Sequence, residues 1–143
     1  MRVLVQRSLS SSVKTSDYFS SIDFGMVILV SFTYGDDIKN IDYMVRKLVN
    51  LRIFDDDNNI MNKSILDVHG SVLSISQFTL YGDAKKGNRP SYAKALNFDK
   101  AKEFYDIFNE KLSLFVPVKT GVFGADMLLN IQNDGPVTIL LEG

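Results

Sequence analysis

The amino-acid sequence predicts an α+β fold: a single domain, residues 1–143, of mainly antiparallel or mixed β-sheets packed with two amphipathic helices. Short β-branched segments occur along the chain, and two longer segments have helical periodicity. The two kinds do not alternate as they would in a doubly wound parallel fold. A chain of 143 residues buries about 68–70% of the surface that its unfolded form exposes, so it needs no disulfide or structural metal to form a core.

Strands are predicted in both halves of the chain. Residues 2–7 place Val3, Val5 and Arg7 on one side of an extended segment, and residues 26–32 form a β-branched, aromatic-flanked run of strand length. Further strands are expected at residues 72–80 and, after Pro117, at 118–123, 128–132 and 137–141.

Two segments are predicted to be helices. The first runs from Asp37 to about Leu51, with Asp36 or Asp37 as the N-cap, because apolar residues recur there at spacings of three and four. The second begins after Asn97 as the cap. Its apolar stripe is interpreted as core and consists of Phe98, Ala101, Phe104, Tyr105, Phe108, Leu112 and Phe115.

The composition excludes several chemistries. Without cysteine there is no disulfide framework, thiolate nucleophile or cysteine-ligated zinc. His69 is the only histidine, so one chain cannot build a multi-histidine metal site. Because His69 precedes Gly70 at the start of a strand pattern, we interpret it as a turn residue. We expect no metal and no cofactor.

The charge balance limits the partners. Sixteen basic and seventeen acidic residues give a net charge of −1, which excludes bulk electrostatic attraction as the main source of affinity for nucleic acid but allows a local basic patch. We expect no DNA partner. The longest apolar run is Met26–Val30, and Gln6 and Arg7 stand where a signal peptide needs apolar residues. We therefore expect a cytoplasmic protein without a membrane partner.

Two motifs fail on their spacing. Asp55, Asp57 and Asn59 match the first ligands of an EF-hand loop, but Ile60 and Leu66 replace the required Gly and Glu. A solvated turn is expected there. Gly82 and Gly87 have the spacing of a phosphate loop, yet Asn88-Arg89 follows in place of Lys and Ser or Thr.

Two other segments carry candidate chemistry. In the predicted strand 72–80, apolar Leu73 and Ile75 give way to polar Gln77 and Thr79 on the same face. Either a buried face acquires hydrogen-bonding groups, or a β-bulge after Ser76 turns both residues into solvent. The second segment is Asn133-Asp134-Gly135-Pro136-Val137-Thr138, in which Gly-Pro either forms part of a site or is only a turn into the last strand.

Together these segments resemble the two signature motifs of the D-aminoacyl-tRNA deacylase family, in the form Ser76-Gln77-Phe78-Thr79-Leu80 and Asn133 to Thr138. The resemblance extends in order over nearly the whole chain. It departs from the family at Ser8 to Lys14, where Ser10 occupies a usually basic position, and at the glycine-poor stretch Ser31 to Tyr34. Further matching segments are Val5-Gln6-Arg7, Arg52-Ile53-Phe54, Met61-Asn62, Gly87 to Ser91, Thr120-Gly121, Phe123 and Ala125-Asp126-Met127.

The resemblance implies an enzyme that hydrolyses the ester joining a D-amino acid, or glycine on a non-cognate tRNA, to the terminal adenosine of tRNA. It also implies a homodimer whose active site lies at the subunit interface, where Gln77 to Thr79 of one subunit face Gly135-Pro136 of the other. The Gly-Pro peptide is expected to be cis, and its two carbonyls to sense the substrate's α-amino group. An L side chain would then collide with main chain that a D side chain avoids.

The same resemblance suggests the role of each residue. The Ser76 to Thr79 segment is catalytic: backbone N–H groups near Phe78 and Thr79 hold the oxyanion, while the adenosine 2′-hydroxyl helps to activate water. Thr79 then positions substrate, since no base lies near it to make it a nucleophile. Arg7 secures the Gly-Pro loop or forms a plain surface salt bridge. The remaining candidates are Lys85, Lys86 and Arg89 for tRNA phosphates, and Phe123, Gly124 and Met127 for the adenine pocket or for core packing.

Two alternatives remain open at this stage. A conventional small esterase would use Thr79 as its nucleophile and would hydrolyse simple esters without tRNA. A non-catalytic aminoacyl-tRNA-binding module would bind the same ligand without turnover.

Overall fold

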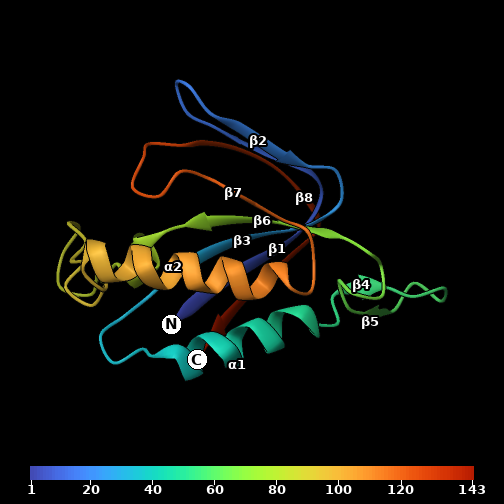
Figure 1. Cartoon of the computed structure of the whole chain (residues 1–143), viewed down its shortest axis with the longest axis horizontal. Coiled ribbons are helices and arrows are strands. Elements are labelled where there is room, and N and C mark those ends of the chain that lie inside the picture. Colours follow the sequence, from blue (N-terminus) through green and yellow to red (C-terminus); the bar gives the residue numbers. More distant parts are fainter.

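The computed structural model describes all residues 1–143, in which a mixed sheet is covered on one face by two helices (Figure 1). The strands are β1 (Arg2–Lys14), β2 (Phe19–Ile22), β3 (Gly25–Ser31), β4 (Phe54–Asp55), β5 (Met61–Lys63), β6 (Ser71–Ser76), β7 (Val118–Thr120) and β8 (Leu128–Glu142); the helices are α1 (Ile38–Val49), α2 (Phe98–Ser113) and the 3₁₀ helix η1 (Phe78–Tyr81).

The main sheet has the strand order β2-β1-β3-β6-β7, and β8 pairs with the other edge of β1. The β3–β6 and β6–β7 pairs are parallel and the other pairs are antiparallel. The predicted α+β class is confirmed.

Both long helices begin at the predicted caps. The Asp37 carboxylate accepts from the backbone N–H of Lys39 (2.8 Å) and Asn40 (3.2 Å), and the Asn40 side chain accepts in return from Asp37 N–H (2.9 Å). The Asn97 side chain caps α2 by accepting from Lys100 N–H (3.1 Å). These bonds satisfy backbone donors that have no partner within the helix, which fixes where each helix starts. None of the helices has the length and apolar character needed to cross a membrane.

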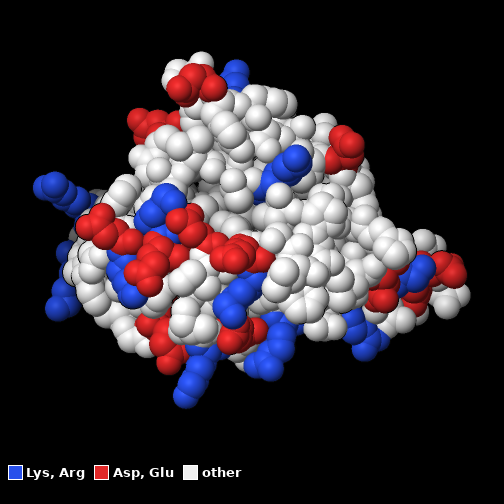
Figure 2. Space-filling view, viewed as in Figure 1, with Lys and Arg blue, Asp and Glu red and all other residues white.

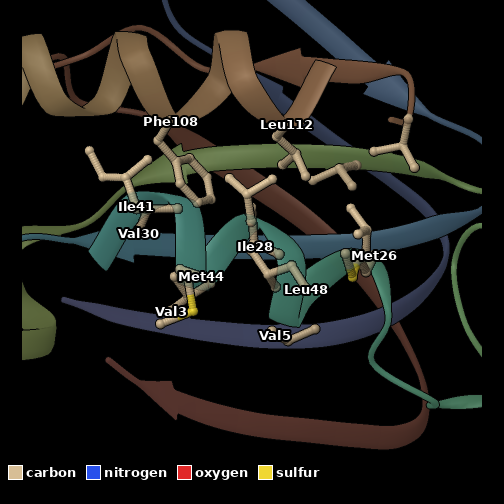
Figure 3. Packing of buried hydrophobic residues seen from close by; sticks show 14 of the residues in the cluster. Val3, Val5, Met26, Ile28, Val30, Ile41, Met44, Leu48, Phe108 and Leu112 are labelled. Carbon is tan, nitrogen blue, oxygen red and sulfur yellow. The ribbon is translucent and has the colours of Figure 1, made fainter. Parts of the chain in front are cut away.

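The main core lies between the sheet and the helices (Figure 3). Val3 and Val5 of β1 and Ile28 of β3 point toward α1 and α2, whose Leu48 and Phe108 are fully buried. A smaller cluster fills the other face, where the outer part of β1 and strand β2 curl over β3 and β6. Its buried members are Val13, Ile22, Val27, Leu73 and Ile75.

Several predicted strand boundaries were wrong, each for a local reason. β1 continues past residue 7 to Lys14 because Ser8 and Ser11 are buried there and hydrogen-bond each other (2.6 Å), so serines occupy positions where a strand pattern requires apolar residues. The predicted strands 128–132 and 137–141 are one strand, β8, which bulges at Gly135-Pro136 but pairs with β1 on both sides of the bulge. β2 was not predicted, and β7 ends at Thr120 instead of residue 123.

Smaller predictions can be checked as well. α1 ends at Val49, two residues before the predicted Leu51. Four residues of the α2 stripe are buried, but Phe98 and Phe115 are exposed at its two ends. His69 lies in an exposed turn with φ 52°, as predicted. The Asp55 to Asn59 segment is a solvated turn between β4 and β5, where N–H groups of Asn58 and Ile60 donate to Asp56 and lower the pKa of its carboxyl.

Replacing Phe108 with alanine tests the helix-to-sheet core. Phe108 is fully buried, so Phe108→Ala should lower the free energy of unfolding by about 3–5 kcal/mol, measured by urea denaturation. Phe115→Ala is the matched control, since this ring is 52% exposed and its loss should cost much less. Equal losses in the two variants would contradict the described packing.

Candidate active site

A cavity of about 780 Å³ opens where β3 and β6 end. The start of α2 and the segment from Phe123 to Met127 form its other walls. Its size and mainly apolar lining are typical of a small-molecule site. The lining residues are Leu29, Val30, Ser31, Phe32, Ile75, Ser76, Gln77, Phe78, Leu96, Phe98, Ala101, Phe123, Gly124, Ala125, Asp126, Met127 and Leu129.

The first signature segment forms the rim of this cavity, but not as the predicted strand to residue 80. β6 ends at Ser76, Gln77 N–H still donates to Val30 O (2.8 Å), and the chain then turns into η1. Gln77 and Thr79 therefore do not lie on one face of a strand. The β-bulge expected as the alternative after Ser76 is not present either, because the chain forms a 3₁₀ turn there. Ser76, Gln77 and Phe78 line the cavity, whereas Thr79 is exposed and is not among the lining residues.

Two backbone donors at this rim have no partner. Leu80 N–H donates to Gln77 O (3.3 Å) and Gly82 N–H to Thr79 O (2.9 Å), which closes the 3₁₀ turn. The N–H groups of Phe78 and Thr79, the first two residues of η1, donate to no group of the chain. Such free N–H groups beside a cavity are suited to hold an anionic oxygen.

The opposite wall is aromatic and closely packed. The rings of Phe98 and Phe123 meet edge to face with centroids 5.1 Å apart. Gly124 has φ +75°, and a Cβ there would lie 2.7 Å from Phe98 Cε2, so a larger residue would push into this wall. Phe123, Gly124 and Met127 thus line the cavity, and Phe123 and Met127 also pack against the two cores. The sequence analysis missed Phe98, which it placed in the core, and Asp126, the one charged lining residue.

Two tyrosines, Tyr81 of η1 and Tyr105 of α2, lie next to residues that line the cavity. Burial raises the pKa of Tyr81 to about 12, an effect increased by Asp36 and partly offset by Arg2. Burial also raises the pKa of Tyr105, whose hydroxyl donates to Ser74 O (2.7 Å). Both phenols are therefore protonated at neutral pH. His69 lies before Ser71, the first residue of β6, and the cavity lies at Ser76, the last residue, roughly 17 Å away along the strand.

The second signature segment forms the bulge in β8. The Gly135-Pro136 peptide is cis, and both residues are exposed. The Asn133 side chain holds the ends of the bulge together, because its Nδ2 donates to Arg7 O (3.0 Å) and to Val137 O (2.9 Å). Its Oδ1 accepts from Thr138 Oγ1 (3.1 Å). The bulge is thus a defined feature that projects from the sheet.

Arg7 is buried beside this bulge, so it does not form the plain surface salt bridge that was the alternative interpretation. Its Nη1 donates to Ile53 O (2.9 Å) and to Asp55 Oδ1 (3.2 Å). Its Nε forms an ion pair with Asp134 Oδ2 (2.8 Å), but the angle does not allow a hydrogen bond. Since a Cβ on Gly135 would lie 3.4 Å from Arg7 Nη2, the guanidinium packs directly against the Gly-Pro turn.

Within one chain the two signature segments are far apart. Gln77 hydrogen-bonds to Val30 of β3, which pairs with Val3 of β1, so the first segment lies beside Val3. Gly135 lies between the Gln6–Thr138 and Ser8–Asn133 pairs, so the second segment lies beside Arg7. Four residues along β1 correspond to roughly 13 Å, and about three strand spacings of roughly 4.8 Å separate the segments across the sheet. One chain therefore cannot bring both segments to the same aminoacyl group.

The predicted RNA-binding loop follows η1 directly. Lys85, Lys86 and Arg89 are all exposed and form no ion pair, on a loop closed by reciprocal backbone bonds between Asp83 and Ser91 (2.8 and 2.9 Å). Lys85 N–H donates to Asp83 and lowers the pKa of that carboxyl. The three cations thus project freely from the end of the molecule that carries the cavity.

Comparison of the chain with known protein families and solved structures agrees with this geometry. A family model described as D-Tyr-tRNA(Tyr) deacylase matches residues 4–142.

The chain belongs to the D-Tyr-tRNA(Tyr) deacylase family. It is accordingly a hydrolase that acts on ester bonds, a D-aminoacyl-tRNA deacylase. It is similar to a solved structure named c-Myc DNA Unwinding Element Binding Protein, at 40% identity and a TM-score of 0.94 over 100% of this chain and 99% of that one. A probable eukaryotic D-amino acid tRNA deacylase shares its fold, at 17% identity and a TM-score of 0.85 over 98% of this chain and 97% of that one.

Replacing Arg7 with lysine tests whether the guanidinium positions the deacylase's Gly-Pro turn. Lysine keeps the positive charge, but its single ammonium nitrogen cannot replace the three contacts that the guanidinium makes with Ile53, Asp55 and Asp134. Arg7→Lys should lower the free energy of unfolding by about 1–3 kcal/mol and reduce kcat/KM for deacylation under conditions where the variant is folded. Asp55→Asn, which leaves the contact with Asp134 in place, should have the smaller effect on kcat/KM. Wild-type activity in Arg7→Lys would exclude the positioning role.

Proposed function

We propose that this deacylase removes D-amino acids, and glycine from non-cognate tRNA, while it spares L-aminoacyl-tRNA, and that each active site is shared by two copies of the chain in a homodimer. The observation that carries this proposal is the separation of the two signature segments within one chain. Gly135-Pro136 is exposed on its bulge and free to reach a second molecule. The cavity edge at Gln77 and Phe78 is open to receive it.

In this proposal the terminal adenosine occupies the cavity. Its base lies against the aromatic wall of Phe98 and Phe123, and the ester carbonyl lies at the rim beside Phe78 and Thr79. The two free N–H groups then hold the oxyanion that forms when water attacks the carbonyl carbon. Their value comes from being fixed in place before the reaction by the closed 3₁₀ turn.

The adenosine 2′-hydroxyl assists the attacking water, which loses a proton as its oxygen bonds to the carbonyl carbon. Collapse of the tetrahedral intermediate breaks the bond to the 3′-oxygen, which takes up a proton. The products are the free amino acid and tRNA. An activated ester needs little beyond orientation and an oxyanion partner, so the lack of cysteine and of a nearby histidine does not prevent the reaction.

Selection against L-amino acids is assigned to the partner copy. The carbonyls of Gly135 and Pro136 receive the substrate's α-amino group, and the main chain occupies the space where an L side chain would lie. Gly135 has φ +109°, and a Cβ there would lie 2.8 Å from Val137 Cγ2. Since this barrier is main chain, the side chain of a D-amino acid can vary widely.

The first prediction is selectivity between enantiomers. D-Tyr-tRNA should be hydrolysed at least about 100-fold faster than L-Tyr-tRNA, because about 2.7 kcal/mol of steric exclusion suffices for that ratio. Release of labelled tyrosine from the two substrates, prepared on the same tRNA, measures it. Glycyl-tRNA should be cleaved as well, since glycine has no side chain to exclude. Comparable rates on both tyrosyl enantiomers would reject the assigned selection.

The second prediction separates backbone catalysis from a threonine nucleophile. Thr79→Ala leaves both free N–H groups in place, so it should lower kcat by about tenfold or less. Removal of a nucleophile lowers kcat by factors on the order of 10⁶ in a serine protease. Single-turnover deacylation compares the two proteins, with Thr79→Ser as the control that keeps the hydroxyl. A covalent aminoacyl ester trapped on Thr79 would favour the conventional esterase, and binding without turnover in the wild type would favour the non-catalytic module.

A further inference from the structure

A second hollow, of about 510 Å³, lies at the C-terminal end of α1 and the loop that follows it. Three of its six lining residues are cations and none is acidic. We call it the α1 groove. Its residues are Tyr43, Arg46, Lys47, Asn50, Leu51 and Arg52.

The cations of the α1 groove are free to bind an external anion. Arg46 and Lys47 are exposed and form no ion pair. Arg52 uses its Nε to donate to Asn62 O (2.9 Å). Its two terminal nitrogens form no hydrogen bond or ion pair, although Arg52 lies near enough to Asp67 to help lower the pKa of that carboxyl. The acidic residue on this part of α1, Asp42, is already paired with Lys111 (2.7 Å).

The helix dipole does not account for this cluster by itself. Arg46 and Lys47 lie in the last turn of α1, where positive charge is favourable. Arg52 lies beyond the helix end and is anchored by the β5 strand instead. Figure 2 shows basic side chains projecting along the lower edge of the molecule, where α1 runs in Figure 1.

The α1 groove lies on the Gly135 side of the molecule. Arg52 precedes Ile53, whose carbonyl accepts from Arg7 Nη1 (2.9 Å), and Arg7 packs against Gly135. In the shared site, the copy that supplies Gly135-Pro136 therefore also brings its α1 groove toward the cavity of the other copy. The loop with Lys85 and Arg89 comes from the copy that supplies the cavity. Two basic segments, one from each copy, then border a single site.

We propose that the α1 groove binds backbone phosphates of the substrate's RNA stem. This inference rests on the proposed shared site. Arginine and lysine suit phosphate oxygens, and contacts of this kind position a nucleic acid without reading its sequence. Tyr43 and Asn50 add a hydroxyl and an amide at the same surface. The groove lets an enzyme of net charge −1 hold RNA without selecting one tRNA by sequence.

Salt dependence is the direct signature of these contacts. Each neutralised phosphate contributes about 0.7–0.9 to the slope of log K against log salt concentration. The loop of Lys85, Lys86 and Arg89 can account for at most three such contacts, and the α1 groove adds up to three more.

The test is the affinity of an uncharged RNA hairpin that carries a tRNA acceptor stem and a single-stranded CCA end. Its Kd is measured by fluorescence anisotropy at several salt concentrations. The triple variant with Arg46→Gln, Lys47→Gln and Arg52→Gln should bind about 100-fold more weakly at 0.1 M salt, with a slope smaller by about 2–3. The double variant Arg46→Gln and Lys47→Gln, which leaves the Arg52–Asn62 bond in place, should lose an intermediate amount.

The matched control changes net charge by two elsewhere. Lys102 is already paired with Asp106 on α2, and Lys119 is exposed on the edge strand β7, so Lys102→Gln with Lys119→Gln should bind RNA nearly as the wild type does. Unchanged Kd and slope in the triple variant, or an equal loss in the control, would overturn the inference. Cleavage of 3′-O-(D-tyrosyl)adenosine, which has no backbone phosphate, tests the wild type's proposed reaction separately from this binding.

Discussion

The pairing of β1 on both of its edges is the constraint on which the rest of the structure depends. This strand has 13 residues and pairs with β3 and then β2 along one edge, and with β8 along the other. Its inner half carries Val3 and Val5 into the helix-facing core, and its outer half carries Val13 into the second cluster. Both cores, and the curl of the sheet between them, therefore follow from one continuous strand.

The same pairing separates the two chemically distinctive segments. The free N–H groups of Phe78 and Thr79 lie at the end of the sheet where the cavity opens, whereas the Gly135-Pro136 bulge interrupts the β1–β8 pairing near Arg7. A separation fixed by strand register cannot be closed by side-chain motion. We therefore propose that one copy supplies the oxyanion donors and the other the chiral barrier, with a basic segment beside each.

Sequence periodicity predicted the elements whose apolar pattern is complete. Both helices were identified, with Asn97 as one cap and either Asp36 or Asp37 as the other, because capping and burial act locally; the cap is Asp37. The outer half of β1 was missed because buried Ser8 and Ser11 satisfy each other instead of being apolar. The signature residues were found through a family resemblance, but the turn after Ser76 depends on the pairing of Gln77 with Val30, which only the folded sheet supplies. Likewise Phe98 and Asp126 join the cavity, and Arg52 joins the α1 groove, through folding alone.

The most direct test of the shared site is complementation between two inactive variants. Gly135→Ala introduces a Cβ 2.8 Å from Val137 Cγ2 and so damages the bulge. Phe78→Pro removes one free N–H at the first position of η1, where proline is tolerated, and Phe78→Ala controls for loss of the ring. Heterodimers of Gly135→Ala with Phe78→Pro, isolated through two different affinity tags, have one doubly damaged site and one intact site. We predict about half of the wild-type kcat per dimer on D-Tyr-tRNA; a heterodimer no more active than either parent would contradict a site built from two copies.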